Sequence, residues 1–208
     1  MTETSSGEQW LAQTEQDVLR DPATVTPAFA LAGRKVGRGP SDPETDPHGV
    51  VYGGVEDHAR ARLVCALLEA SVTAAAPVLA ELFHQGDSAE RRGVLRGLDA
   101  AVLKDLELPE EVVTLGVELV GEALRANEQD LVAAAVGPFA AAHLDQHSWR
   151  HAVLKLVFME VSLDAVAQLE SRRDAELARM AEDFAAERRA AGRPVPDDVF
   201  RLTPEGSA

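Results

Sequence analysis

The chain has 208 residues, of which 46% are hydrophobic and 26% are charged, as in soluble globular proteins with enough chain to bury a core. Its 20 Lys and Arg against 35 Asp and Glu give a formal net charge of −15. A chain this acidic is repelled by phosphate backbones and by anionic lipid, so neither nucleic acid nor a membrane surface is expected as a partner.

Aromatic residues make up 4% of the chain, so alanine, valine and leucine must fill the core. This composition favours close-packed helices over a β-sandwich, whose strands need β-branched and aromatic residues in alternation. The single cysteine, Cys65, cannot form an internal disulfide and stands in an apolar segment. We expect it to be a buried and inert thiol.

The first eight residues contain neither a basic segment nor an apolar one, so no secretory signal is predicted. The longest mostly apolar run, 131–144, is interrupted by Gly137 and Pro138 and is shorter than the ~20 residues that a membrane helix needs. We therefore expect a cytoplasmic protein without membrane insertion.

Apolar residues recur at helical spacing along most of the chain, and no segment alternates as a strand would. Helices are predicted over 8–20, 27–36, 55–84 with a break or new first turn at Pro77, 88–106, 109–126, 127–136, 145–161, 162–170 and 174–191. Asn127 is a favourable N-cap, and Gly192 followed by Pro194 is typical of a helix end. The predicted fold class is all-α: one domain over 1–208, an antiparallel, α-solenoid-like array without a sheet.

The stretch 37–54 is rich in glycine and proline and is the one clearly non-helical segment. At about eighteen residues it exceeds the ~12–15 beyond which a structureless loop is usually functional or disordered. Two interpretations stay open, a surface excursion and a lid over a site. The prolines after Gly192 also predict a flexible C-terminal tail over 194–208.

His143, His147 and His151 are spaced four residues apart, which places them on roughly one helical face. This is a metal-ligand spacing, but Lys155 continues the same row, and a fixed cation disfavours a divalent ion. The row is therefore interpreted as structural or solvent-facing, as an anion-binding or acid–base row, or, least favoured, as a metal site. No metal is predicted.

Lys155 also stands within a strongly apolar segment, 152–158. It either extends its ammonium group to the surface or points into a polar cavity. In a cavity it would hold an anionic group or act as a base with a lowered pKa.

The last predicted helix has an apolar stripe at Leu177, Met180 and Phe184. The next positions of that stripe are Glu187 and Arg188, so we expect both to be largely buried and paired with a charge, at the edge of a site.

Cations gather beside two predicted helix ends, with Arg34, Lys35 and Arg38 around Gly37, and Arg172 and Arg173 before the helix 174–191. They are either solvated or suited to capture a phosphate or carboxylate. The sequence contains no glycine-rich phosphate loop, nucleophile elbow, CxxC pair or dinucleotide fingerprint, so no cofactor is predicted.

Four segments resemble the EboA family: LRAN at 124–127, HSWRHAVLKLVF at 147–158, RDAELARM at 173–180 and ERRAAGR at 187–193. The segment 27–37 resembles that family's opening motif more weakly. The resemblance implies a protein encoded in a gene cluster that makes or moves a small natural-product precursor, beside prenyltransferase-like, sugar-cyclase-like and hydrolase-like proteins. The chain departs from the family in its long 37–54 loop, its alanine-rich helices and its Gly137–Pro138 turn.

The predicted function is an accessory protein of natural-product biosynthesis or trafficking that binds a small anionic, partly apolar metabolite between helices. The expected ligand-binding residues are Arg34, Asn127, Trp149, Phe158, Arg173 and Arg188, together with Lys155.

Two alternatives stay open. The first is a cofactor-independent enzyme of the same pathway, with Lys155 or His147 as base and Glu187 as acid. The second is a scaffold that docks other enzymes of the same gene cluster through its acidic surface. The oligomeric state does not follow from the sequence.

Overall fold

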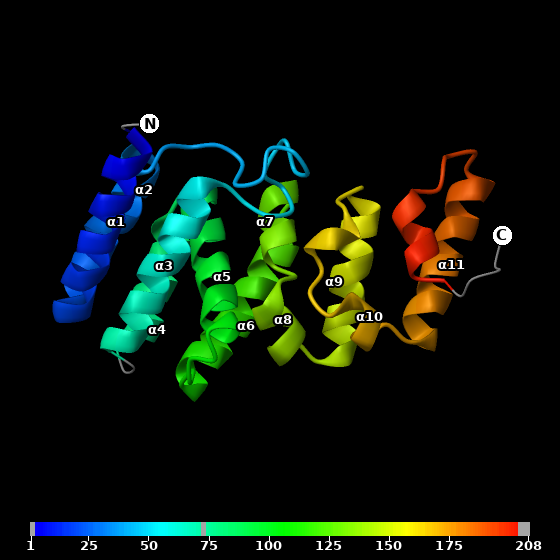
Figure 1. The fold of residues 1–208 in the computed structure, drawn as a ribbon. Coiled ribbons are helices and arrows are strands. Elements are labelled where there is room, and N and C mark those ends of the chain that lie inside the picture. Colours follow the sequence, from blue (N-terminus) through cyan, green and yellow to red (C-terminus); the bar gives the residue numbers. More distant parts are fainter. Residues whose placement is uncertain (1–2, 72–73, 204–208) are drawn as a thin grey trace.

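The computed structural model describes residues 3–71 and 74–203, and most of them are helical. In Figure 1 the helices stand side by side in an elongated row, from α1 (Glu3–Arg20) near the N-terminus to α11 (Ala175–Ala190) near the C-terminus. The described part of the chain contains no sheet, and its strand-like pairing is limited to an isolated bridge between Pro40 and Gly54. The predicted all-α class is confirmed.

The described residues form eleven α-helices and three short 3₁₀ helices. Between α1 and α11 lie η1 (Pro22–Thr24), α2 (Val25–Lys35), α3 (Val55–Ala70), α4 (Ala75–Gln85), α5 (Ser88–Leu103), α6 (Glu110–Leu124), α7 (Gln129–Ala134), α8 (Pro138–His143), α9 (Gln146–Phe158), η2 (Leu163–Ala165) and α10 (Leu169–Arg172), and η3 (Asp197–Arg201) follows α11. None of these described helices is both long and apolar enough to cross a membrane.

Most predicted helices are present. The predicted helix 162–170 is wrong, because only η2 and the start of α10 are helical there and Gln168 before α10 has a left-handed backbone with φ 57°. The α8 helix was not predicted: Gly137 is its N-cap and Pro138 its first residue, so this pair begins a helix as well as separating two. The α7 helix has Glu128 as its N-cap, and Asn127 is exposed. Pro77 lies in the first turn of α4, where a missing N–H leaves no hydrogen bond unmade.

The helices α3 and α5 pack against each other most extensively, and α1, α2, α4, α7 and α8 pack around them. Gly97 allows this close approach, because a Cβ atom at this position would lie 2.4 Å from the Cβ of Val64. The core is continuous and consists mainly of leucine, valine and alanine, as the scarcity of aromatic residues predicted.

The 37–54 segment runs along one edge of the row from α2 to the start of α3 (Figure 1). Asp46 is buried, and its carboxylate accepts hydrogen bonds from the backbone N–H groups of Val50, Val51 and Tyr52 at 3.0, 2.8 and 2.8 Å. A buried carboxylate is tolerable because these three donors satisfy it. The segment is therefore folded around Asp46.

The described part of the predicted C-terminal tail also packs against the helices. Val199 in η3 and Leu202 are buried in the core at 1% and 3% exposure, and Asp198 accepts a hydrogen bond from the backbone N–H of Leu163 at 2.8 Å. Residues 197–203 of the predicted tail thus lie against the helices, and residues 204–208 lie outside the described part.

Candidate functional site

The residues predicted to bind a ligand do not meet at one place. Arg34 is exposed near the end of α2, and Arg173 is exposed at the end of α10. Figure 1 shows α2 at one end of the row and α10 and α11 toward the other. Asn127 lies between α6 and α7, outside both of these ends.

The α9 residues are divided between core and surface. Trp149 is fully buried, and the guanidinium carbon of Arg172 lies 4.8 Å from the centre of its ring, whereas Phe158 is 66% exposed. Lys155 is half-buried, which agrees with a side chain that extends to the surface. Because Trp149 is enclosed and Phe158 faces solvent, the two rings do not form one pocket wall.

The histidines of the predicted row have different surroundings. His147 and His151 are exposed, with ring centres 4.5 Å apart. The His143 ring lies 4.6 Å from the Phe139 ring, and partial burial lowers the pKa of His143. Within residues 3–71 and 74–203, no three His, Cys, Asp or Glu side chains are grouped as metal ligands would be.

The predicted burial of Glu187 is wrong. Glu187 is exposed, because the buried stripe of α11 consists of Leu177, Ala181 and Ala185 and therefore turns away from it. Arg188 follows that stripe: its side chain is 18% exposed, it pairs with Glu160 at 3.1 Å, and its Nε donates to the carbonyl oxygen of Pro194 at 2.8 Å. The charge pairing of Arg188 is thus confirmed, with Glu160 as partner.

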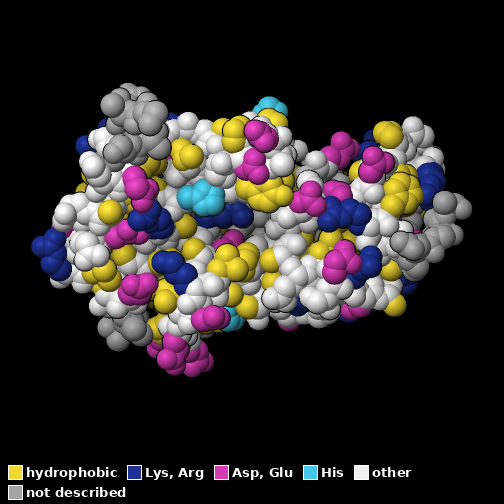
Figure 2. Space-filling model, in the orientation of Figure 1, with side chains coloured by type: hydrophobic (Ala, Val, Ile, Leu, Met, Phe, Trp, Pro, Cys, Tyr) yellow, Lys and Arg dark blue, Asp and Glu magenta, His cyan; other side chains and the backbone are white. Residues whose placement is uncertain are grey.

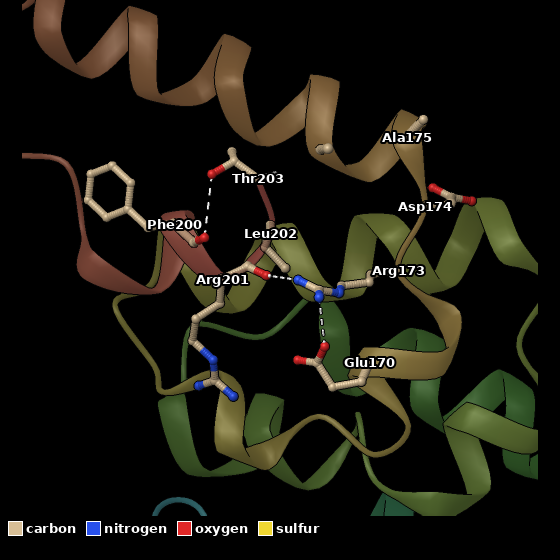
Figure 3. A pocket seen from close by; sticks show the side chains of 9 residues that line it. Glu170, Arg173, Asp174, Ala175, Phe200, Arg201, Leu202 and Thr203 are labelled. Atoms are coloured by element: carbon tan, nitrogen blue, oxygen red, sulfur yellow. Dashed lines mark hydrogen bonds and ion pairs between the residues drawn. The ribbon is translucent and has the colours of Figure 1, made fainter. Parts of the chain in front are cut away.

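Arg173 lines a cavity of about 550 Å³ between α10, the start of α11 and η3 (Figure 3). Figure 3 shows its guanidinium group between Glu170 and the backbone of Arg201; it pairs with Glu170 at 2.9 Å and donates to the Arg201 carbonyl oxygen at 2.7 Å. Arg188 lines a separate cavity of about 470 Å³ beside Glu160. In both cavities the cation already has an acidic partner on the protein.

A third cavity, of about 380 Å³, lies near the middle of the row and is here called the central cavity. The 37–54 segment, α3, α5, the start of α8 and the region of η2 form its wall. Its lining residues are Ser41, Val51, Tyr52, His58, Ala61, Arg96, Asp99, Ala100, Leu103, Gly137, Pro138, Asp164, Ala165 and Ala167. On the face drawn in Figure 2 the surface is hollowed near the middle, where hydrophobic side chains lie beside basic side chains and a histidine.

The wall of the central cavity contains two ionisable side chains from adjacent turns of α5, the buried Asp99 and the partly buried Arg96. Asp99 is 5% exposed; its Oδ1 accepts a hydrogen bond from the backbone N–H of Phe139 at 2.9 Å, and its Oδ2 has no hydrogen-bond partner. Arg96 approaches that Oδ2 to 3.9 Å through Nη1, and its Nη2 donates to the Val51 carbonyl oxygen at 2.6 Å. The Nε of Arg96 is buried and also unpartnered.

Burial raises the pKa of Asp99 to about 6, because a carboxylate loses its hydration there. The Arg96 cation and the Phe139 N–H act in the opposite direction and limit the rise of this pKa. The group therefore changes its charge close to physiological pH, as carboxyl groups in functional sites often do.

Several hydrogen bonds hold the 37–54 segment in place at the central cavity. Ser41 Oγ donates to the Gly53 carbonyl oxygen at 3.0 Å, and His58 Nε2 lies 3.1 Å from the Tyr52 carbonyl oxygen. With the bond from Arg96 to Val51, these contacts fix the backbone over 51–53 at the cavity. These contacts do not distinguish the two interpretations of 37–54, a surface excursion and a lid over a site.

A second group of charged side chains lies close to the Arg96–Asp99 pair. Asp57 is buried at 1% exposure; it accepts hydrogen bonds from the Gly54 N–H at 3.0 Å and from Arg92 Nε at 3.2 Å. Arg92 Nη1 also contacts Asp130 at 2.5 Å. One guanidinium group thereby connects α3, α5 and α7 beside the central cavity.

The charges of the central cavity were not predicted, although the sequence contains a signal for them. Arg92, Arg96 and Asp99 are spaced four and three residues apart, which places three charged side chains on one face of α5. Charged residues on a helix face that packs against another helix are costly unless they are paired or used. The sequence does not show which face of α5 is buried, so this spacing by itself does not distinguish a buried charged face from a solvated one.

The fold is that of an elongated all-α protein with a cavity near the middle of the row and a charge pair in the wall of that cavity. The family model described as "Metabolite traffic protein EboA" matches residues 51–204, and the chain belongs to this family. No curated protein and no solved structure matches the chain significantly.

Proposed function

We propose that this chain binds a small, partly apolar metabolite in the central cavity and serves as an accessory protein of natural-product biosynthesis or trafficking. The observation that carries the proposal is the charge pair in the wall of that cavity, Arg96 and Asp99, whose buried Nε and Oδ2 atoms have no hydrogen-bond partner on the protein.

An unsatisfied buried polar atom typically costs about 1–3 kcal/mol, and more when the group is charged. A folded protein therefore rarely keeps such atoms without a use, which makes this wall of the cavity a candidate site. The remaining wall includes Val51, Ala100 and Leu103, which suits an apolar part of the metabolite.

The family assignment supports the same proposal. Its description refers to metabolite traffic, and the matched residues 51–204 include all of the cavity lining except Ser41. Metabolite traffic requires reversible binding of a small molecule, and the central cavity offers a site of suitable size and mixed polarity.

The proposed site differs from the one inferred from the sequence. An anionic ligand was inferred because Arg34, Lys155 and Arg173 were expected to lie together, and these three residues are distributed along the row. Likewise, among the described contacts no hydrogen bond or ion pair joins Lys155, His147 and Glu187 as an acid–base set. The proposal therefore rests on Arg96 and Asp99.

Recovery of the bound metabolite tests the proposal. The chain and its variants would be expressed in the organism from which the sequence comes, purified gently and extracted for mass spectrometry. Wild-type protein should carry a stoichiometric small molecule that Arg96→Met has lost. Ala100→Leu should lose it as well, because it fills the cavity without changing a charge.

Two matched variants serve as controls. Arg173→Met removes a cation from the cavity of Figure 3, and Lys155→Met removes the cation of the sequence-based prediction. Both should retain the molecule. Loss in Lys155→Met or Arg173→Met with retention in Arg96→Met would place the site elsewhere, and wild-type protein free of any extracted molecule would contradict the proposal. Thermal unfolding of each variant separates loss of binding from loss of the fold.

A further inference from the structure

Two imidazole rings lie side by side on the exposed face of α9. His147 and His151 stand one helical turn apart, both are exposed, and their ring centres are 4.5 Å apart with 65° between the ring planes. Among the described residues, the histidine rings that form hydrogen bonds with the protein are those of His58 and His84. The described part of the protein therefore leaves the ring nitrogens of His147 and His151 free to turn toward one bound ion.

The third histidine of the predicted row does not belong to this pair. His143 is the last residue of α8, a separate helix, and its ring lies 4.6 Å from the Phe139 ring. Within the described residues no three His, Cys, Asp or Glu side chains are grouped for a metal ion. A site on α9 would therefore have two protein ligands, His147 and His151.

The donor set of this pair indicates which metal it would bind. Two imidazoles four residues apart on one helix have the spacing with which a helix chelates a divalent transition metal. Protein zinc sites use three or four protein ligands. Copper(II) and nickel(II) accept a tetragonal set of nitrogen and oxygen ligands, and copper(II) binds most tightly in the divalent series. Two imidazoles with water in the remaining positions therefore suit copper(II) best.

The charge at the start of α9 is compatible with a cation at this pair. A helix N-terminus carries a partial positive charge, which by itself opposes a bound cation. Asp145 offsets this charge: it is the N-cap of α9, and its carboxylate accepts hydrogen bonds from the Ser148 N–H and Oγ, both at 2.8 Å. These bonds and, to a smaller extent, His147 lower the pKa of Asp145, so its negative charge is present at neutral pH.

The neighbouring basic side chains are either paired or flexible. Arg150, which lies between the two histidines in the sequence, pairs with Asp174 at 2.5 Å. Lys155 continues the histidine row one turn beyond His151 and was the reason to expect no metal from the sequence. Its long, flexible side chain allows the ammonium group to move away from an ion at the two imidazoles.

We infer that His147 and His151 form a binding site for a divalent transition metal, copper(II) before nickel(II), with water in the positions that the protein leaves open. These open positions allow a small nitrogen or oxygen ligand to join the ion. The residues that line the central cavity all come from other elements, so the inference is independent of the proposed function.

Titration of the untagged chain with copper(II) and with nickel(II) tests the inference. Calorimetry at neutral pH should give one saturable site per chain, and the electron paramagnetic resonance spectrum of bound copper(II) should show coupling to two imidazole nitrogens. Nickel(II) should bind at the same site at least about tenfold more weakly, in the order of stability of divalent complexes. Nickel(II) does not oxidise the thiol of Cys65, so binding of both metals at one site excludes a reaction at that residue.

Variants assign the site to the two rings. His147→Gln and His151→Gln should each weaken copper(II) binding at least about tenfold, because the second imidazole binds an ion that the first already holds. Both side chains are exposed, so the substitutions should leave the fold intact. His143→Gln, on α8, should bind like wild type. Lys155→Met should bind at least as tightly as wild type, because it removes a like charge near the ion.

Three results would overturn the inference. The first is an unchanged copper(II) affinity in a folded protein that carries both His147→Gln and His151→Gln. The second is binding that does not saturate at one ion per chain, as expected for loose association of cations with a chain of net charge −15. The third is an affinity that stays constant as the pH falls from neutral to about 5, because imidazoles must lose their protons to bind a metal.

Discussion

The carboxyl group of Asp99 occupies the space above Gly137 in which any other residue would carry its Cβ atom: a Cβ built there would lie 2.1 Å from Asp99 Oδ2. Gly137 has φ −75° and ψ −163°, a conformation that other residues adopt readily. Glycine is therefore required here for a steric reason. The missing side chain of Gly137 allows α5 to place the Asp99 carboxyl group against the start of α8.

Gly137→Ala should destabilise the protein by about 1–3 kcal/mol, because a methyl group at this position must displace the Asp99 carboxyl group or the start of α8. Urea unfolding measures the change. Gly121→Ala is a suitable control, because Gly121 lies inside α6 with only the end of the Arg125 side chain near its Cβ position. It should stabilise by roughly 0.5–1 kcal/mol through helix propensity. Equal effects of the two substitutions would contradict the close packing of Asp99 on Gly137.

Asp99→Asn should change how stability depends on pH. The pKa of Asp99 is raised from 3.8 to about 6 in the folded protein, so the folded state binds its proton more tightly than the unfolded state does. The contribution of this group is favourable below about pH 4 and is lost as the pH rises through about 6. Relative to Asp99→Asn, wild type should therefore lose up to roughly 3 kcal/mol of unfolding free energy across this range.

Urea unfolding at several pH values measures that difference, and taking it between the two proteins cancels groups that they share, such as Asp174, whose pKa is lowered by its hydrogen bond to Arg150. Arg96, His58 and Asp164 also face the central cavity and are common to both proteins. A difference that stays constant between pH 4 and 7 would show that Asp99 is not a buried titrating group.

Asp46→Ala should release the segment over the central cavity. The carboxylate accepts three backbone N–H groups, from Val50, Val51 and Tyr52, and these donors lose their partner in the variant. Hydrogen exchange measured by mass spectrometry should rise over 46–54 by at least about tenfold, which corresponds to roughly 1.4 kcal/mol. Asp42→Ala, which removes a local exposed contact to Thr45, should leave exchange at 50–54 unchanged.

Arg188→Ala should lower the unfolding free energy by about 1–2 kcal/mol. The side chain is largely buried, donates to the Pro194 carbonyl oxygen and lies over the Phe184 ring, so its removal costs hydrogen bonding and packing. Glu187→Ala should change stability by less than about 0.5 kcal/mol, as exposed substitutions usually do. A loss for Glu187→Ala as large as that for Arg188→Ala would restore the inward placement that the sequence predicted for both residues.

The approximate positions of most helices could be predicted from the sequence. Helical spacing of apolar residues is a local property, as are the caps: Asp87 begins α5 and Asp174 begins α11 by accepting hydrogen bonds from nearby backbone N–H groups. The alanine- and leucine-rich core, the buried Cys65 and the family resemblance are likewise visible in the order of residues alone. The ends of helices were less certain, as the unpredicted α8 shows.

The tertiary structure decided which helix faces are buried and therefore which charges matter. Extrapolating the stripe of α11 placed Glu187 inward, but the packed stripe runs through Ala181 and Ala185 and leaves it in water. Conversely, Arg96 and Asp99 look like ordinary helix-surface charges until α3, α8 and the 37–54 segment pack over them. Periodicity defines a face relative to its own helix, whereas burial and a raised pKa depend on what other segments place against that face.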